Sequence, residues 1–284
     1  MLTEYITFKN ILVFCKPEYD SRTTTVKEQI RKYARMRGIP FYVGEIITSD
    51  EPTLIVSIGG DGTMLAAMRA SLSFPVATVV GFNTGTLGFL TEEIPASISE
   101  FLDGIWMHED VEFEERMILK AILSVDGKER SNTYEAINEF ILSGSTVNTP
   151  LTTQVYINDN FVSEQMGSGV LVATSTGSTA MALSSGGAIV SPSTNIMQIV
   201  PVLPHTLTAR PIISTGRDSI TLVGNLTDRV SGIEIHADGR VLTSVTNIEG
   251  TEVSITIEKH EKTVKIWHPK DWNFFSVLSE KMKW

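Results

Sequence analysis

The sequence predicts an α/β plus all-β chain: a Rossmann-like N-terminal domain, then a β-rich, β-sandwich-like domain with one embedded helix. Three observations support this. The first third of the sequence alternates short apolar runs with helical stretches. The residues after about Val111 form strand-like pieces that are rich in β-branched residues and joined by hairpin turns. A length of 284 residues is sufficient for two medium domains. The polar connector His108–Asp110 places the boundary between domains 1–108 and 109–284, and we expect the C-terminal tail to pack back on the first domain.

The elements expected in the first domain are short strands separated by helices. Near-continuous apolar strands in this arrangement are typical of a parallel sheet covered on both faces. One helix ends at Gly38, a residue suited to a helix C-terminus. The strands are expected at Ile11–Phe14, Phe41–Val43, Leu54–Ile58 and Val76–Phe82, and the helices at Val26–Arg37, after Gly62 and at Pro95–Leu102.

The second domain is expected to consist of antiparallel strands with hairpin turns. The turns are Asp126-Gly127, Asn158-Asp159 and Asp238-Gly239, because these pairs favour the tight turns of hairpins. One helical window, Ser178–Ser185, interrupts the strands and ends at Gly186-Gly187. The expected strands are Met117–Val125, Tyr134–Leu142, Gln154–Ile157, Val170–Thr174, Ser219–Val223, Ile233–His236, Val253–Ile257 and Val264–Trp267.

Charge and composition exclude several classes of protein. The 23 Lys and Arg residues against 33 Asp and Glu residues give a net charge of −10. This disfavours nucleic-acid partners and anionic membrane surfaces, and at first sight phosphate-bearing substrates as well. The single cysteine, Cys15, excludes an intramolecular disulfide and fits a reducing compartment, and no apolar window approaches the roughly 20 residues of a membrane span. We therefore expect a cytoplasmic protein.

Two glycine-rich turns follow expected strands of the parallel sheet. Gly59–Thr63 comes directly after the strand Leu54–Ile58, and Asn83–Gly88 comes directly after Val76–Phe82. Ligands of open parallel sheets bind beyond the carboxyl ends of the strands, where backbone N–H groups and helix N-termini attract anions. Neither turn matches the P-loop or the dinucleotide fingerprint. The pair predicts a phosphate site of another kind, although two tight strand–helix connections are the simpler alternative.

Asp61 stands among three glycines in the first turn. Its carboxylate can accept a hydroxyl proton or hold Mg²⁺ beside a phosphate. It can equally form a turn by bonding to its own backbone. Residue type and spacing leave the two alternatives open.

A third segment, Gly167–Met181, joins a strand to a hydroxyl-rich turn and then to the embedded helix. Ser178 or Thr179 can cap that helix. The small residues would also let a base or a ribose approach the backbone, and the two roles are compatible.

These motifs together resemble the ATP-dependent NAD kinase family over about Leu54 to Arg240. The glycine-rich GGDG turn alone is shared with lipid kinases and phosphofructokinases, whereas the full ordered set is specific. The resembling segments are Gly59–Leu65, Asn83–Gly85, Leu87–Thr91, Glu115–Met117, Asn138-Glu139, Thr176–Ala180, Ser184, Gly186-Gly187, His205–Leu207, Arg210-Pro211 and Asp238–Arg240.

The resemblance implies transfer of a phosphoryl group from ATP, or polyphosphate, to the adenosine-ribose 2′-hydroxyl of NAD. It implies that Asp61 is the general base. It also implies that Mg²⁺ accompanies ATP without a dedicated metal site on the protein, and that the protein is a homodimer or homotetramer. An aspartate is a weak base at neutral pH, so positioning and Mg²⁺ must lower most of the barrier. The implied NAD-binding residues are Asp61, Gly62, Asn138, Glu139, Ser168, Thr179, Ala180, Ser184 and Arg240, and the implied phosphate-binding residues are Gly59, Gly60, Thr84 and Gly85.

The chain departs from the family pattern at four positions. Met166 and Ser168 replace an expected Arg and Asp, Met181 replaces a Tyr, and Arg240 replaces a Gln. These changes alter the nicotinamide end of the expected pocket and leave the reacting end intact. They motivate one alternative, a kinase of the same fold acting on another nucleotide, a nucleoside or a lipid alcohol. A second alternative is a non-catalytic dinucleotide sensor, against which Asp61 argues.

Overall fold

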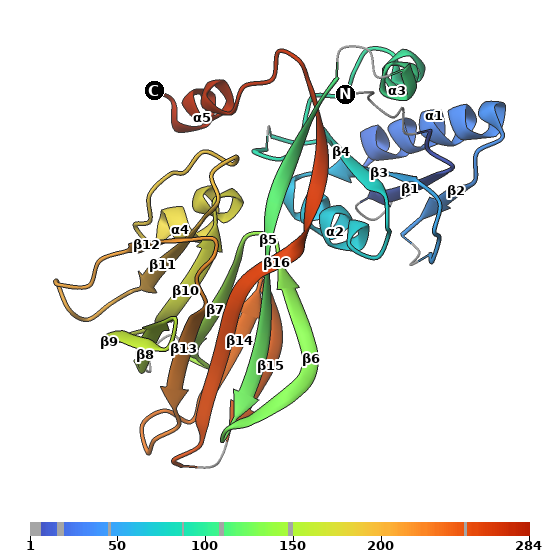
Figure 1. The fold of residues 1–284 in the computed structure, drawn as a ribbon. Helices are drawn as coiled ribbons and strands as arrows, with labels where there is room; N and C mark the ends of the chain where they lie inside the picture. The colour runs from blue at the N-terminus through green and yellow to red at the C-terminus, as the bar shows by residue number, and fades with distance from the viewer. Residues whose placement is uncertain are drawn as a thin grey trace. The chain divides into compact units, whose positions relative to one another are not determined.

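The computed structural model describes residues 7–15, 20–44, 47–86, 88–107, 111–146, 150–246 and 249–284 (Figure 1). The chain forms two compact units. The first comprises Met1–Arg116 and Thr263–Trp284, and the second comprises Met117–Lys262. Each unit is described by itself.

The four N-terminal strands of the sheet in the first unit have the order β2-β1-β3-β4. All three pairings among them are parallel, and every residue of β3 is buried. The apolar runs of the sequence form these strands because both faces of a parallel sheet are covered. The bounds are β1 (Asn10–Cys15), β2 (Phe41–Val43), β3 (Thr53–Gly59) and β4 (Ala77–Asn83).

Helices cover both faces of this sheet (Figure 1). Helices α1 (Ser21–Arg37) and α3 (Ile98–Met107) share one apolar core with alternate residues of β1, β3 and β4. Helix α2 (Asp61–Ser71) packs on the other face through Met64 and Met68. Helix α1 is capped at its start by Asp20, whose carboxylate accepts the Arg22 N–H, and it ends at Gly38 in the left-handed region.

The C-terminal segment belongs to the first unit. The last part of strand β16 (Glu252–Pro269) lies beside β4, with Ile266 opposite Val79. The Trp267 ring packs edge-on against Phe101 at 4.4 Å between ring centroids and is 5% exposed. Helix α5 (Phe274–Met282) follows, capped by the Asn273 side chain.

The second unit is built from two sheets with an apolar core between them. One sheet contains β16, β13, β8 and β9 in that order, with β5 and β6 attached through β16, and the other has the order β12-β11-β10-β7-β14-β15. The core takes buried residues from strands of both sheets. The bounds are β5 (Val111–Val125), β6 (Lys128–Ala136), β7 (Glu139–Gly144), β8 (Leu151–Ile157), β9 (Asn160–Gly167), β10 (Gly169–Thr174), β11 (Ile196–Val202), β12 (Ile212–Thr215), β13 (Ile220–Asn225), β14 (Gly232–Ala237) and β15 (Arg240–Thr246).

The three expected hairpin turns are confirmed. Asp126, Asn158 and Asp238 each have a positive φ, as does the residue that follows each of them. Two consecutive positive φ values match the right-handed twist of the strands that the turn joins.

Several element bounds differ from expectation. The expected strand Tyr134–Leu142 is two strands separated at Ile137-Asn138, and the pieces Val253–Ile257 and Val264–Trp267 are parts of the single strand β16. Helix α3 begins at Ile98 and continues through Gly104 to Met107, because Ile105 is buried in the core. The helical window is a 3₁₀ turn, η1 (Thr176–Thr179), followed by the short helix α4 (Met181–Ser184).

Four strands, β9, β11, β12 and β15, were not expected from the sequence. Three of them, β9, β12 and β15, lie at sheet edges. These strands have few buried residues, and apolar side chains such as Phe161 and Val241 are exposed, so their sequences lack the alternation of a strand with one buried face. In β11 the apolar run contains Pro201, which weakens a strand pattern.

The chain crosses between units twice, at residues 116/117 and 262/263, whereas the sequence suggested one boundary at 108/109. The reason is that β5 and β16 are continuous strands, each contributing residues to both units. The connector 108–110 lies outside the described residues, as does Leu87 of the second glycine turn. Among the described residues, no helix has the length and apolar character needed to cross a bilayer.

Trp267 provides a test of how the C-terminal segment stabilises the first unit. Trp267→Ala removes a buried indole and should destabilise the protein by about 3–5 kcal/mol. The matched change Trp284→Ala removes an indole that is 75% exposed and should change stability by less than about 0.5 kcal/mol. Urea unfolding followed by circular dichroism measures both, and similar midpoints for the two variants would contradict this packing.

Candidate functional site

The carboxyl ends of β1, β3 and β4 form one edge of the parallel sheet. Cys15 is opposite Ile58, and Gly59 is opposite Asn83. The order β2-β1-β3-β4 reverses direction between β1 and β3, and open α/β sheets bind ligands in the crevice at such a switch point. The loops that follow β3 and β4 therefore border the expected ligand position within the first unit.

Asp61 is the first residue of α2 and is oriented by two backbone donors. Its Oδ2 accepts the Phe89 N–H at 3.0 Å, and its Oδ1 accepts the Leu90 N–H at 3.2 Å. The helix N-cap, Gly60, makes no side-chain capping bond. Asp61 is thus anchored to a segment 28 residues away rather than to its own turn, which argues against the simple turn-forming alternative. A carboxylate has about four acceptor positions, so two remain for a ligand.

Gly88 is required for this arrangement. A Cβ atom at position 88 would lie 1.9 Å from Asp61 Oδ1 and 2.6 Å from the Thr91 hydroxyl. Because only glycine leaves room for the carboxylate, residues 88–90 and Asp61 form one interlocked unit.

The turn after β4 differs from expectation in its hydrogen bonding. The Thr84 N–H donates to Gly59 O at 3.2 Å, and the Gly85 N–H donates to Asn83 Oδ1 at 2.6 Å. The amide of Asn83 in turn donates to Thr86 O and to the Thr91 hydroxyl. The Thr84 and Gly85 N–H groups thus serve internal contacts, and a phosphate-binding role of these two residues stays a prediction.

In the second unit, Asp238 holds the backbone at the break between β6 and β7. Its carboxylate accepts N–H groups from Ile137 at 3.0 Å, from Asn138 at 2.7 Å and from Glu139 at 3.4 Å. Asp238 lies in the β14–β15 turn, about a hundred positions away. Asp238 belongs to one of the motifs that resemble the family, but its sequence context does not predict this role, and the Asp-Gly turn is its local signal.

Glu139 is a buried carboxyl group, 4% exposed, at the start of β7. Burial, and secondarily the charge of Asp238, raise the pKa of Glu139 to about 8, while a hydrogen bond from the Met181 N–H acts in the opposite direction. Within the described part of the chain, Glu139 Oε2 is buried and has no hydrogen-bond partner. A buried, unpartnered carboxyl oxygen is costly unless a ligand or water satisfies it.

The turn Thr176–Thr179 packs directly on Asn138. A Cβ atom at Gly177 would lie 2.2 Å from Asn138 O, and the Thr174 hydroxyl donates to Ile137 O at 2.7 Å. This brings Asn138 and Glu139 next to the turn and to helix α4, the elements that carry Thr179, Ala180 and Ser184. These five predicted residues therefore form one group with Asp238.

Arg240 and Ser168 occupy different places in the second unit. Arg240 is exposed and opposite Ala237 in the turn that contains Asp238, so it borders the group. Ser168 lies at the start of β10, where its N–H donates to Val202 O, whereas Thr174 is at the end of that strand. Six strand residues separate the two ends by about 20 Å. Ser168 is therefore not part of the group around Asp238.

The side chains around Asp61 suit a metal ion that arrives bound to the phosphates of a substrate. Among the described residues, no cluster of three or more His, Cys, Asp or Glu side chains could hold a metal ion. Mg²⁺ in phosphoryl-transfer sites is bound by one or two carboxylates together with substrate phosphates. The single carboxylate Asp61 fits an ion that enters with a triphosphate.

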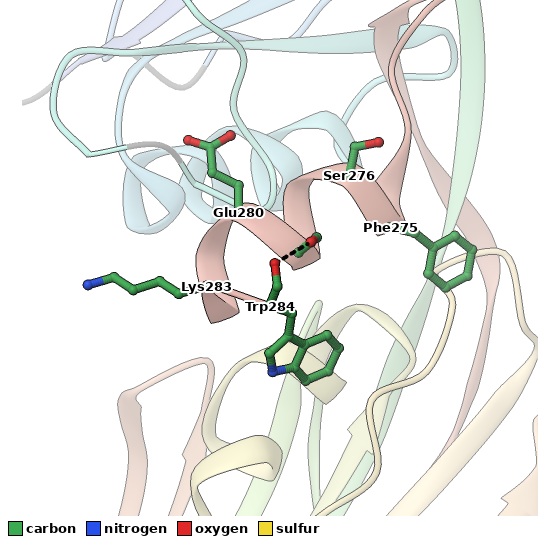
Figure 2. A pocket seen from close by; sticks show the side chains of 6 residues that line it. Phe275, Ser276, Glu280, Lys283 and Trp284 are labelled. Atoms are coloured by element: carbon green, nitrogen blue, oxygen red, sulfur yellow. Dashed lines mark hydrogen bonds between the residues drawn. The ribbon is translucent and has the colours of Figure 1, made fainter.

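A hollow on helix α5 is unlike either of these sites. Its volume is about 640 Å³, and its lining comes from α5 and the residues that end it, with the Ser279 hydroxyl donating to Trp284 O. Figure 2 shows Phe275, Glu280 and Lys283 pointing away from one another. Without converging polar groups, this surface is not a candidate for chemistry.

Comparisons with known proteins identify the family. Residues 21–110 match the ATP-NAD kinase N-terminal domain, and residues 137–266 match the ATP-NAD kinase C-terminal domain. A NAD kinase of Shewanella halifaxensis is 34% identical, the alignment covering 98% of this chain and 92% of the relative. A NAD kinase of Photobacterium profundum is 38% identical over 83% of this chain and 78% of its own length.

Two solved structures share the fold. Yeast NADH kinase complexed with NADH has a TM-score of 0.83 at 20% identity, covering 98% of this chain and 88% of its own. An Archaeoglobus fulgidus NAD kinase in complex with ATP has a TM-score of 0.71 at 23% identity, and the match covers 96% of this chain and 98% of that structure's chain. The mixed α/β first unit and β-rich second unit agree with these folds. Since both family domains match in order and relatives above 30% identity span nearly all of its length, the chain belongs to the ATP-NAD kinase family.

Proposed function

We propose that this protein is a NAD kinase, a phosphotransferase that moves the γ-phosphoryl group of ATP to the adenosine-ribose 2′-hydroxyl of NAD. The observation that carries the proposal is the Asp61 carboxylate, held by two backbone N–H groups at the carboxyl edge of the parallel sheet. The family assignment makes the other acceptors and the non-catalytic sensor less favoured, because a binding protein needs no oriented carboxylate at this position.

In the proposed reaction Asp61 accepts the proton of the 2′-hydroxyl. As that oxygen forms its bond to the γ-phosphorus, the bond from this phosphorus to the β,γ-bridging oxygen breaks and ADP leaves. Gly59, Gly60 and Gly62 surround Asp61 without side chains and let the phosphates approach the first turn of α2. Bound with ATP, Mg²⁺ would neutralise charge on the transferred group, with Asp61 as its protein ligand.

The group around Asp238 is proposed to hold the adenosine end of NAD. Glu139 Oε2 has no partner among the described residues and suits a ribose hydroxyl. Below its raised pKa, the Glu139 carboxyl group is protonated and can donate as well as accept a hydrogen bond. Asn138, Thr179, Ala180 and Ser184 would line the same pocket, with Arg240 at its border meeting the phosphates of NAD.

Three further expectations remain predictions. These are the role of Ser168 at the nicotinamide end, assembly as a homodimer or homotetramer, and a cytoplasmic location. The exposed side chains of Met166 and Met181 leave that end of the pocket without the expected charged and aromatic groups.

Asp61→Asn tests the catalytic role. Asparagine cannot accept the hydroxyl proton and has one acceptor oxygen for two backbone donors, so kcat for NADP formation should fall at least about a hundredfold. The variant should remain folded, with a modest loss of stability because one backbone N–H loses its acceptor, and its affinity for Mg·ATP should also fall because Asp61 is the proposed protein ligand of Mg²⁺. Asp271→Asn, an exposed change with the same loss of charge, is the control. Turnover of Asp61→Asn equal to that of the control would refute the assignment.

Gly88→Ala tests whether the position of Asp61 matters, with the carboxylate itself unchanged. The added methyl group displaces the carboxylate, because its Cβ would lie 1.9 Å from Asp61 Oδ1. We expect kcat to fall at least about tenfold, since small misplacements of catalytic groups have large effects. Initial-rate assays beside circular dichroism spectra measure this, and a folded variant with wild-type kcat would rule out the required geometry.

Glu139→Gln tests the environment of the second group through pH. The folded-state pKa of Glu139 is raised from 4.5 to about 8, so its stabilising contribution is full below pH 4.5 and lost as pH rises toward 8. Glutamine is neutral at every pH, so the variant keeps the stability that a neutral side chain at position 139 provides. The melting temperature of Glu139→Gln relative to wild type should therefore increase between pH 5 and pH 9. The exposed change Glu249→Gln should show no such trend, and parallel curves for Glu139→Gln and wild type would contradict the raised pKa.

A further inference from the structure

We propose that Arg22 binds the phosphates of the phosphoryl donor, in a hollow between the first turn of α1 and the turn after β4. The hollow has a volume of about 310 Å³ and is lined by Arg22, Asn83, Gly85, Glu93 and Ile94, all in the first unit. This inference rests on the proposed kinase function and names a residue that donor binding requires.

The location of the hollow agrees with the topology of the sheet. Helix α1 follows β1, and α2 follows β3, so their first turns flank the switch point between these strands. The hydrogen bond from the Thr84 N–H to Gly59 O joins the wall of the hollow to the loop that precedes Asp61. A triphosphate whose γ-phosphate lies near Asp61 can therefore extend along this wall.

The turn after β4 leaves the anion without its two expected backbone donors. The Thr84 and Gly85 N–H groups donate to Gly59 O and to Asn83 Oδ1, and the Asn83 amide is itself bonded within the turn. A phosphate in this hollow consequently needs a side-chain donor. The Arg22 guanidinium lines the hollow and has the planar fork that matches phosphate oxygens.

The position of Arg22 is unfavourable for the helix that carries it. Arg22 lies in the first turn of α1, where the helix dipole disfavours a cation, and no acidic residue in that turn compensates. Its side chain is exposed, and among the described residues no carboxylate forms an ion pair with it. A residue that opposes local stability and forms no ion pair with the described carboxylates suits a role in binding an external anion.

Two carboxylates lie near Arg22 and have different roles. Asp20 accepts the Arg22 N–H at 3.0 Å and the Thr23 hydroxyl at 2.9 Å, and a hydrogen bond from Thr84 further lowers its pKa. Asp20 therefore ties α1 to the wall of the hollow. Glu93 lines the hollow and is exposed, so its charge opposes an anion there. Arg22 and Glu93 should thus affect donor binding with opposite signs.

The test compares Arg22→Gln and Glu93→Gln with wild type and with Arg35→Gln. Arg35, in the last turn of α1, provides the same loss of charge far from the hollow. Initial rates of NADP formation at varied Mg·ATP and varied NAD give both KM values. Thermal stabilisation by inorganic tripolyphosphate gives donor-site binding without turnover.

Arg22→Gln should raise KM for ATP at least about tenfold and abolish the tripolyphosphate stabilisation, with KM for NAD unchanged. Glu93→Gln should lower KM for ATP, and the unliganded melting temperature of Arg22→Gln should not fall. A KM for ATP within about twofold of wild type, or an equal effect of Arg35→Gln, would overturn the role of Arg22. A wild-type protein that forms no NADP would instead refute the proposed function, and tripolyphosphate binding would still decide whether Arg22 holds phosphates.

Discussion

The parallel pairing of β3 with β1 and β4 is the constraint on which the first unit depends. Strand β3 is buried along its whole length, and its pairing places Gly59 opposite Asn83. Since parallel strands end at one edge of a sheet, two loops 24 residues apart in sequence become neighbours. The continuous pairing of β3 with β1 and β4 and its complete burial therefore hold the loop that carries Asp61 in a fixed position at the edge of the sheet.

The second unit assembles its polar group by a different means. A β-sandwich has no row of parallel strand ends, and here a single carboxylate, Asp238, gathers the three backbone N–H groups of residues 137–139. Burial, and secondarily the charge of Asp238, which this contact brings near, raise the pKa of Glu139. The hairpin turn that carries Asp238 thus orders the backbone and also contributes to the raised pKa.

The net charge of −10 describes the whole surface and not the places where anions would bind. In the proposed function, phosphates meet the uncapped first turn of α2, the guanidinium of Arg22 and Mg²⁺, all of which act over a few ångströms. Charges farther away than about a Debye length of 8–10 Å are screened by salt. An acidic protein can therefore bind a phosphate-rich substrate, provided that local donors oppose its overall charge.

The sequence by itself determined the features that depend on local pattern. Continuous apolar runs predicted β1, β2 and β3, Gly38 marked the end of α1, and the Asp-Gly and Asn-Asp pairs predicted three hairpin turns. The ordered motifs around Asp61, Asn138 and Glu139 identified the family. The edge strands β9, β12 and β15 escaped prediction because few of their side chains are buried on either face, so the alternation typical of a half-buried strand is missing.

Only the tertiary structure decided which distant groups meet. No local pattern shows that Asp61 is held by Phe89 and Leu90, that Gly88 must leave room for it, or that the Thr84 and Gly85 N–H groups are already bonded. The same holds for Asp238, whose backbone N–H donors lie about a hundred positions away, and for Ser168, which the fold places apart from this group. Hydrogen bonds and close packing act between neighbours in space, and these neighbours are set by strand pairing rather than by sequence.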